Sequence, residues 1–319
     1  MKFVKMHGAG NDYIYVNGFL ETVSEPSKVA EILSDRHFGI GGDGLVLILP
    51  SKAADFRMQM FNADGSEGKM CGNAIRCVGK FVYDNGMTDK TEITVETLSG
   101  IKPIQLNVED GVVTSARVNM GKPEFDAAKI PVIPLPADAS ADASADASAD
   151  ASADASADAS ADASADAKAD ASADALVTFP VTVNDDMFKV KTFYVNCVSM
   201  GNPHAVIFVE GDEELTDELV LGYGPLIEKH SAFPDRINVE FVKVIDNKTL
   251  KMRVFERGSG ETLACGTGAS AVAVVSKTKG MTDESVDVIL LGGVLKIEYG
   301  ADGFVFMTGP ATKVFEGEI

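Results

Sequence analysis

Two cysteines in matching surroundings are the residues of this 319-residue chain best suited to do chemistry. Cys71 lies in the run Met-Cys-Gly-Asn and Cys265 in the run Ala-Cys-Gly-Thr, each at the expected start of a helix. Unpaired N–H groups and the helix dipole favour an anion there, so we expect each thiol to have a pKa below its ordinary value of about 8.5. The same N–H groups could bind a substrate carboxylate.

An internal duplication relates the two cysteines. When the chain is shifted by 194 residues, residues 61–89 lie over residues 255–283 without a gap. A shorter echo pairs Gly10-Asn11 with Gly201-Asn202 at a shift of 191 residues. We therefore predict that the chain contains one structural unit twice. The identical positions of the longer match are Phe61/Phe255, Glu67/Glu261, Cys71/Cys265, Gly72/Gly266, Val78/Val272 and the runs 86–89 and 280–283.

Each copy has the same order of elements. An alternating strand leads into a Gly-rich loop and the cysteine, and an apolar helix then ends at Gly86 or Gly280, where a C-cap is expected. A second alternating strand follows. The pattern predicts an α+β fold of two pseudo-symmetric halves that face each other across a cleft, with the two sulfurs opposed. The predicted strands are 56–61 and 91–96 in the first copy and 250–255 and 285–290 in the second.

Two opposed thiols suit stereoinversion at a carbon acid. One group must remove a proton from one face of the carbon while another delivers a proton to the opposite face. A thiolate and a thiol of similar pKa can exchange these roles without a cofactor. The alternative is that Cys71 and Cys265 form a structural disulfide or merely occupy helix starts, and spacing leaves both interpretations open. Cys77 and Cys197 have no duplicate partner, so we expect them in the core.

Other motifs fail on context or spacing. The run Gly-Ile-Gly-Gly-Asp-Gly at 39–44 matches a dinucleotide-binding pattern, but a helix-like stretch (27–37) precedes it and a strand-like stretch (45–49) follows it. A dinucleotide loop needs the reverse order. The four histidines show no metal-ligand spacing, the cysteines form no C-x-x-C pair, and no G-x-S-x-G elbow is present. We predict neither a nucleotide nor a metal site.

Charge and composition narrow the class of protein. Lys and Arg number 28 against 48 Asp and Glu, which gives a net charge of −20. Nucleic acids and anionic membranes attract clustered positive charge, so neither is an expected partner. The apolar runs are too short to span a bilayer, the N-terminus lacks the apolar region of a signal peptide, and four cysteines are too few for a disulfide scaffold. We expect a cytoplasmic protein.

A repetitive acidic tract occupies residues 137–175. It holds 20 Ala, 10 Asp, 8 Ser and one Lys in a four-residue repeat, so it contributes −9 to the net charge. None of its side chains can build a core. We interpret it as a disordered or weakly helical insertion in a surface loop, acting as an inert linker.

The runs that carry these features resemble the diaminopimelate epimerase family. They are K-M-H-G-A-G-N-D-Y-I (5–14), F-N-A-D-G-S-E-G-K-M-C-G-N-A-I-R-C (61–77), M-G-N-P-H-A-V (200–206) and E-R-G-S-G-E-T-L-A-C-G-T-G-A (256–269). They cover both halves, and only the acidic tract falls outside. The resemblance implies a homodimeric isomerase that converts LL-diaminopimelate to the meso form without a cofactor or metal, for lysine and peptidoglycan synthesis.

The resemblance also implies the domain plan. Each domain is a curved mixed or antiparallel sheet around a central helix, with the active site in the cleft between them. The last strand returns to the first domain. We therefore expect one domain over residues 1–120 plus 308–319 and the other over 121–307, interrupted by the tract at 137–175.

By the same resemblance, Cys71 and Cys265 form the acid/base pair. Cys71 donates while Cys265 abstracts in one direction, and the roles reverse in the other. His204 and Glu256 would tune the thiol pKa values. Gly44 departs from some relatives, which have Gln there, so that polar contact is not expected here. The implied substrate-binding residues are Asn11, Asn62, Gly72, Asn73, Asn202, Asn238, Glu256, Arg257, Gly266 and Thr267.

Two rival functions remain. A proline-type racemase shares the two-cysteine chemistry, but Asn238 and the Glu256-Arg257 pair favour a substrate with a second amino-acid head group, which proline lacks. The rival from another class is a redox or ligand-binding protein whose cysteines only form a disulfide. Exchange of the substrate α-proton with heavy water separates these classes.

Overall fold

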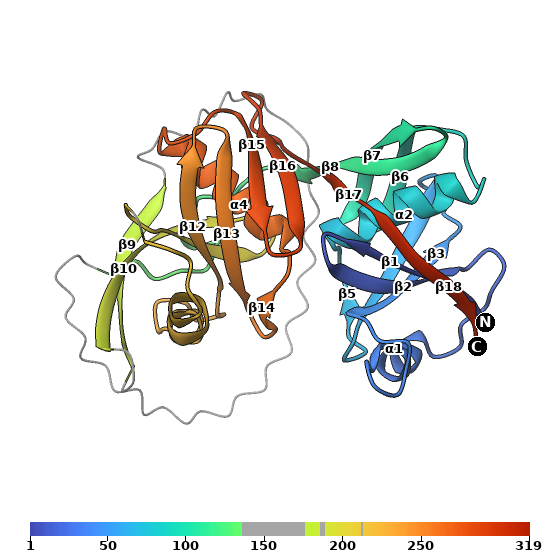
Figure 1. Ribbon diagram of the computed structural model, residues 1–319, viewed down its shortest axis with the longest axis horizontal. Helices are drawn as coiled ribbons and strands as arrows, with labels where there is room; N and C mark the ends of the chain where they lie inside the picture. The colour runs from blue at the N-terminus through green and yellow to red at the C-terminus, as the bar shows by residue number, and fades with distance from the viewer. Residues whose placement is uncertain (136–175, 186–188, 212) are drawn as a thin grey trace.

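The protein is described from a computed structural model that covers residues 1–135, 176–185, 189–211 and 213–319. The acidic tract at 137–175 lies outside the described residues, and so does the prediction made for it. Two lobes lie side by side, joined by long strands that run between them (Figure 1).

The N-terminal lobe wraps a mixed sheet around one helix, α2 (Gly72–Asp84). Neighbouring strands of this sheet alternate in direction of pairing at first. Strand β1 pairs antiparallel with β2, β2 pairs parallel with β3, and β3 pairs antiparallel with β4. Strand β4 then pairs antiparallel with β5 and parallel with β6, which continues antiparallel into β7 and β8. A short helix, α1 (Pro26–Ser34), connects β2 to β3. The strands are β1 (Lys2–Gly8), β2 (Asn11–Asn17), β3 (Gly44–Leu49), β4 (Phe56–Asn62), β5 (Glu67–Gly68), β6 (Glu92–Thr97), β7 (Gly100–Glu109) and β8 (Val112–Gly121).

The C-terminal lobe repeats this plan around α4 (Gly266–Thr278), pairing for pairing. A π-helical turn (Glu218–Tyr223) and α3 (Gly224–Glu228) stand where α1 stands in the first lobe. The duplicated α+β fold inferred from the sequence is therefore confirmed. The strands are β10 (Lys189–Ser199), β11 (Pro203–Phe208), β12 (Asn238–Asp246), β13 (Thr249–Glu256), β14 (Gly260–Thr262), β15 (Ser285–Leu290), β16 (Gly293–Tyr299) and β17 (Val305–Pro310).

Strands cross between the lobes at their ends. Strand β8 pairs antiparallel with β17, and the chain continues from each of them into the opposite lobe. There β18 (Thr312–Glu318) pairs with β1, and β9 (Val177–Asp185) pairs with β10. Both chain ends consequently lie in the N-terminal lobe, where the amino group of Met1 donates to the carbonyl of Ile319 (Figure 1).

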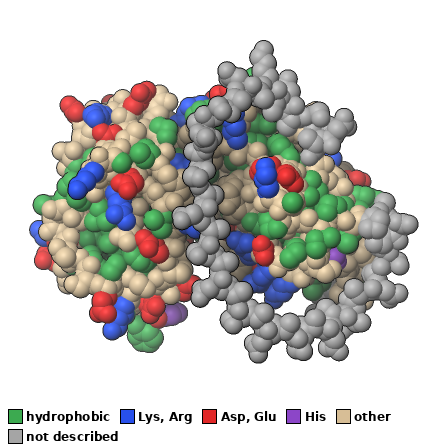
Figure 2. Space-filling view, turned by 180° about the vertical axis from the view of Figure 1, so that it is seen from behind, with side chains coloured by type: hydrophobic (Ala, Val, Ile, Leu, Met, Phe, Trp, Pro, Cys, Tyr) green, Lys and Arg blue, Asp and Glu red, His purple; other side chains and the backbone are tan. Residues whose placement is uncertain are grey.

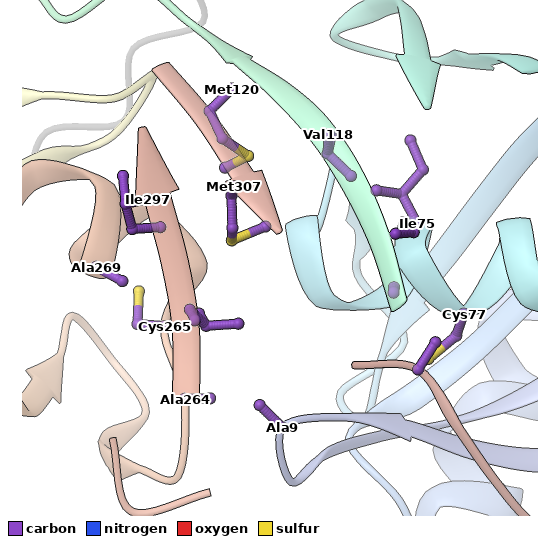
Figure 3. Close-up of a cluster of buried hydrophobic side chains, with 14 of the residues drawn as sticks. Ala9, Ile75, Cys77, Val118, Met120, Ala264, Cys265, Ala269, Ile297 and Met307 are labelled. Carbon is purple, nitrogen blue, oxygen red and sulfur yellow. The ribbon is translucent and has the colours of Figure 1, made fainter. Parts of the chain in front are cut away.

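The starts of α2 and α4 meet around methionine side chains. Met120 and Met307 lie between residues of the two lobes in a shared apolar core (Figure 3). A Cβ atom on Gly72 would lie 2.7 Å from Met307 Cε, and one on Gly266 would lie 2.9 Å from Met307 Sδ. The end of the Met307 side chain therefore lies directly against both helix starts. This packing brings the first turns of the two central helices to the junction between the lobes.

Candidate active site

Cys71 and Cys265 cap the two central helices, as the sequence predicts. Cys71 Sγ accepts the N–H of Ala74 at 3.5 Å, and Cys265 Sγ accepts the N–H of Gly268 at 3.4 Å. All four cysteines of the chain are free thiols, and Cys77 and Cys197 are fully buried in the core as expected. The two capping cysteines therefore stand as thiols rather than as a structural disulfide.

The expected direction of the thiol pKa shifts is wrong. Burial raises the pKa of Cys71, and the N–H groups of Ala74 and Asn73 oppose this without cancelling it. Burial raises the pKa of Cys265 still further, to well above its ordinary value, and the charges of Glu256 and Glu240 add to the effect. The helix start does favour the thiolate, but removal of the thiol from water outweighs it.

On the side of Cys71, an asparagine and a tyrosine approach the sulfur. Cys71 Sγ donates to Asn11 Oδ1 at 3.3 Å, and Asn11 Nδ2 donates to Asp43 Oδ2 at 2.7 Å. The buried phenol of Tyr13 interacts with both Asn11 and Cys71, and burial raises the pKa of Tyr13 well above its ordinary range. The surroundings of Cys71 are thus mostly neutral hydrogen-bonding groups.

On the side of Cys265, carboxylates and an imidazole gather. Cys265 Sγ lies 3.4 Å from Thr267 Oγ1 and interacts with the carboxyl group of Glu256, whose pKa is raised by burial. Fully buried His204 places Nδ1 2.6 Å from Glu240 Oε1, and its Nε2 lies 3.0 Å from Asn202 Oδ1. His204 therefore contacts Glu240 and Asn202, whereas Glu256 interacts with the Cys265 thiol itself.

Three further residues with implied roles lie at strand ends. Asn238 donates to the carbonyl of Pro203 at 3.0 Å and accepts the N–H of Arg257 at 2.9 Å. The exposed guanidinium of Arg257 donates to the carbonyl of Asp235 at 3.0 Å. Asn62 donates to Ser66 Oγ at 3.0 Å. Asn238 thus joins the start of β11 to the end of β13.

The implied site residues occupy equivalent positions of the two lobes. In the first lobe Tyr13 pairs with Gly44, and in the second lobe His204 pairs with Asn238 at the same place in the sheet. The next strand pair agrees, because Leu45 lies opposite Phe61 in the first lobe as Val239 lies opposite Phe255 in the second. The first lobe offers neutral groups at these positions, and the charged Glu256-Arg257 pair belongs to the second lobe alone. The equivalent pairs are Asn11/Asn202, Gly44/Asn238, Asn62/Glu256, Cys71/Cys265 and Asn73/Thr267.

Asn73 joins the two halves of the site. Its Nδ2 donates across the junction to the carbonyl of Ala264, the residue before Cys265, at 3.1 Å. A Cβ on Gly266 would lie 3.7 Å from Asn73 Oδ1, and this buried oxygen has no hydrogen-bond partner among the described residues. A free acceptor therefore lies between the two helix starts.

The backbone at Gly44 excludes a side chain. Its φ is +155°, and a Cβ there would lie 2.0 Å from the carbonyl oxygen of Phe61 on β4. A longer side chain such as Gln cannot be fitted to this backbone.

Sequence reasoning missed three residues of the site: Tyr13, Asp43 and Glu240. The internal repeat holds a signal for Tyr13, because the shift of 191 residues that pairs Asn11 with Asn202 also pairs Tyr13 with His204. Glu240 is the one acidic residue among the apolar side chains at the start of β12. Asp43 follows the glycines at 39–42, and its contact with Asn11 joins segments that a local sequence pattern does not connect.

The surface of one face mixes both signs of charge. Acidic and basic side chains are interspersed over both lobes in Figure 2.

Within the described ranges, no group of three or more His, Cys, Asp or Glu side chains is arranged to hold a metal ion. None of the helices in the described part of the chain is long and apolar enough to cross a membrane.

The fold is similar to that of solved racemases and epimerases. Solved structures with this fold include a probable proline racemase from Agrobacterium radiobacter (TM-score 0.62, 12% identity, covering 100% of this chain and 92% of that one). A hydroxyproline epimerase from Agrobacterium vitis with bound trans-4-hydroxy-L-proline is a second (TM-score 0.60, 13% identity, 99% and 91%).

Sequence comparison identifies the family. The model of the diaminopimelate epimerase family matches residues 3–125 and 196–314. A diaminopimelate epimerase from Acetivibrio thermocellus is 51% identical over 100% of this chain and 98% of the relative. Another from Methanococcus maripaludis is 48% identical over 100% and 99%. The chain belongs to the diaminopimelate epimerase family.

Proposed function

We propose that this protein interconverts LL-2,6-diaminopimelate and meso-2,6-diaminopimelate by proton transfer at one α-carbon, between Cys71 and Cys265. The observation that carries the proposal is the pair of free thiols at the starts of equivalent helices, which meet at the junction of the lobes. Family membership supports the choice of substrate. The reaction supplies meso-diaminopimelate for lysine and peptidoglycan synthesis.

The chemistry needs one thiolate and one thiol on opposite faces of the carbon. The thiolate removes the α-proton, and the second thiol delivers its own proton to the other face, so the two cysteines exchange protonation states in each turnover. No cofactor takes part in this scheme. The backbone N–H groups at Gly72-Asn73 and Gly266-Thr267 hold the α-carboxylate, because helix starts bind anions. Their partial positive charge also stabilises the negative charge that develops on the substrate.

The distal head of the substrate is bound mainly by the second lobe. Glu256 pairs with an ammonium group and Arg257 with a carboxylate, which a guanidinium can bind with two hydrogen bonds. Asn202 and Asn238 supply amide groups, and Asn11 and Asn62 complete the site from the first lobe. The charged pair favours this substrate over proline, which has no second head group.

The two thiols are not equal at rest. Burial raises the pKa of both thiols, and the charges of Glu256 and Glu240 raise the pKa of Cys265 further, whereas the N–H groups of Ala74 and Asn73 lower the pKa of Cys71. Glu256 acts on Cys265 directly, and His204 acts through Glu240 and Asn202. When Cys265 acts as the base, its thiolate lies close to the carboxyl groups of Glu256 and Glu240. The thiolate therefore forms more readily when the negative charge of these carboxyl groups is reduced. We therefore assign Glu256 and His204 to control of the Cys265 thiol.

Proton exchange in heavy water tests the proposal. The reduced enzyme should incorporate deuterium at the α-carbon of LL-diaminopimelate while the meso form appears. L-proline and trans-4-hydroxy-L-proline should show no exchange under the same conditions. Exchange with proline but not with diaminopimelate would establish the racemase alternative. Absence of exchange with all three under reducing conditions would leave the redox or ligand-binding alternative.

The proposal includes domain limits, assembly and compartment. The pairing of β18 with β1 supports a first domain of residues 1–120 plus 308–319 and a second of residues 121–307. Family resemblance supports a homodimer, and four free cysteines suit the reducing cytoplasm. Light scattering that gives the mass of a single chain at working concentration would contradict the dimer.

A further inference from the structure

The loop at 39–44 delivers a carboxylate to the site. Glycine lets the backbone approach β2 closely, since a Cβ on Gly42 would lie 3.1 Å from the carbonyl oxygen of Asp12. The N–H of Asp43 donates to the carbonyl of Asp12 at 2.6 Å, and the N–H of Asp12 donates back to Asp43 Oδ2 at 3.0 Å. These two hydrogen bonds to β2 fix the Asp43 carboxylate beside Asn11.

The Asp43 carboxylate decides which end of the Asn11 amide faces the sulfur. A carboxylate only accepts hydrogen bonds, so the 2.7 Å contact to Asp43 Oδ2 must be made by Asn11 Nδ2. The amide oxygen is then left for Cys71 Sγ, at 3.3 Å. An oxygen that accepts from the thiol stabilises its protonated form, whereas an amide N–H in the same place would stabilise the thiolate.

We propose that Asp43 is a positioning residue for Cys71, acting through Asn11 to keep a hydrogen-bond acceptor against the sulfur. The inference rests on the proposed function for its meaning, because a reversible two-base reaction needs two thiols of similar proton affinity. Carboxylates already raise the proton affinity of Cys265. The Asn11 oxygen raises the proton affinity of Cys71 as well. The proton affinities of the two thiols thereby become more similar.

The second lobe holds its equivalent asparagine differently. Asn202 Oδ1 lies 3.0 Å from His204 Nε2, so its amide oxygen is turned to the imidazole. In the first lobe, the position of His204 is taken by Tyr13, and the orienting group comes from the loop. The orientation of the asparagine by a loop carboxylate is therefore specific to the first lobe.

Several other titratable groups lie near Cys71 and Asp43. The titratable groups that interact with Cys71 are Tyr13 and Tyr15 of β2, Arg76 and Cys77 of α2, and Glu256 at the end of β13. Arg36 and Asp12 act on Asp43, and Lys5 pairs with Asp12. The test must separate the orientation of Asn11 from the loss of these ion pairs.

The variant Asp43→Asn tests the positioning role, with alkylation of Cys71 by iodoacetamide as the readout. Asn at 43 can donate to Asn11, which frees the Asn11 amide to turn its N–H toward the sulfur. The rate of Cys71 labelling, followed by peptide mass spectrometry against pH, should reach its midpoint about one pH unit lower than in the parent. An unchanged midpoint in a folded variant would overturn the proposal.

Two further variants make the result specific. Arg36→Gln breaks the ion pairs to Asp12 and Asp43 but leaves the bond from Asp43 to Asn11, and the Arg36 side chain is mostly exposed. Its labelling midpoint should move by less than about 0.3 pH unit, because exposed charges are screened. Asn11→Ala removes the acceptor, so its midpoint should also fall. Adding Asp43→Asn to Asn11→Ala should then have no further effect.

The labelling readout does not depend on the substrate. If the parent enzyme fails to exchange the α-proton of diaminopimelate, the proposed function fails while the labelling profiles still decide the role of Asp43. If Asp43→Asn does not fold, a folded Asn11→Ala with the parental midpoint overturns the proposal. A further shift in the double variant also overturns it, because Asp43 would then act on the thiol without Asn11.

Discussion

Tyr13 and His204 occupy the same position in the two lobes. Tyr13 on β2 pairs with Gly44 at the start of β3, and His204 on β11 pairs with Asn238 at the start of β12. Both side chains are buried, but Tyr13 keeps a neutral phenol beside Cys71, whereas His204 lies 2.6 Å from the carboxylate of Glu240. A symmetric backbone therefore holds its two thiols in unlike electrostatic surroundings.

Removing either capping thiol should abolish epimerisation. The variants Cys71→Ser and Cys265→Ser keep the size of the side chain, but a hydroxyl is a far weaker acid than a thiol, so turnover should fall by at least about 10³-fold. Conversion of LL-diaminopimelate is followed by chiral chromatography. The buried Cys197 provides the control, because Cys197→Ser should lower stability and leave the turnover of the folded protein near that of the parent. Full activity of Cys265→Ser would refute the two-base scheme.

The local parts of this site could be predicted from the sequence. Helix starts at Cys71 and Cys265 follow from the Gly-rich approach and the apolar run, and the helix ends follow from Gly86 and Gly280, which adopt φ of +66° and +70° just after the caps. These features depend on a few neighbouring residues. The duplicated register extends the same reasoning to whole strands.

The sign of the thiol pKa shifts could not be predicted in the same way. The helix start is visible in the sequence, but burial outweighs it, and both cysteines belong to or pack against a core cluster drawn from segments far apart in the chain. The contact between Asn11 and Asp43 is also tertiary, since a helix and a loop separate them in the chain. Desolvation and long-range pairing depend on packing, which a local pattern does not specify.

The activity of the enzyme should have an alkaline optimum. A thiolate must act as the base, so the rate falls as pH drops below the thiol pKa. Because burial raises the pKa of both Cys71 and Cys265, this acidic limb should lie above the value of about 8.5 typical of a free thiol. The measurement is kcat/KM against pH with LL-diaminopimelate. An acidic limb below pH 7 would contradict the effect of burial.

Oxidation should inactivate the enzyme reversibly. Two thiols that flank one α-carbon are close enough to form a disulfide when the cleft closes without substrate. The two thiol hydrogens are then transferred to the oxidant. Diamide should abolish activity and dithiothreitol should restore it, with the cross-linked peptides detected by mass spectrometry. Cys77 should remain unmodified, because burial raises the pKa of its thiol to about 11. Oxidative loss of activity in which Cys71 and Cys265 stay reduced would contradict this prediction.

A side chain at Gly44 should destabilise the protein. In Gly44→Ala the new methyl group would meet the Phe61 carbonyl at 2.0 Å, so the backbone of β3 must move, at a cost of roughly 3 kcal/mol in the free energy of unfolding. Gly86→Ala is the control, because Gly86 also has a positive φ but no atom lies within 4 Å of its Cβ position. It should cost about 1 kcal/mol. Equal urea midpoints for the two variants would show that the contact at Phe61 is relieved without strain.

Removing the acidic tract should leave the fold and the chemistry intact. The chain on both sides of it is anchored in one apolar core, because Leu135 and Val177 pack against the same buried cluster of the C-terminal lobe. The tract at 137–175 has no side chain more apolar than Ala, so it can bury little surface. Closing so long a loop costs on the order of 1–2 kcal/mol at most, since this entropy grows only with the logarithm of length.

The deletion that joins Pro136 to Leu176 tests this expectation. The melting temperature should stay within about 5 °C of the parent, and turnover within roughly twofold. A second variant that changes the ten Asp of the tract to Asn keeps its length and removes its negative charge. Because charges are screened beyond about 8 Å at physiological salt, this variant should match the parent in KM for diaminopimelate. A large loss of stability on deletion would show that the tract packs on the body, whereas lost turnover at unchanged stability would show that it controls access to the thiols.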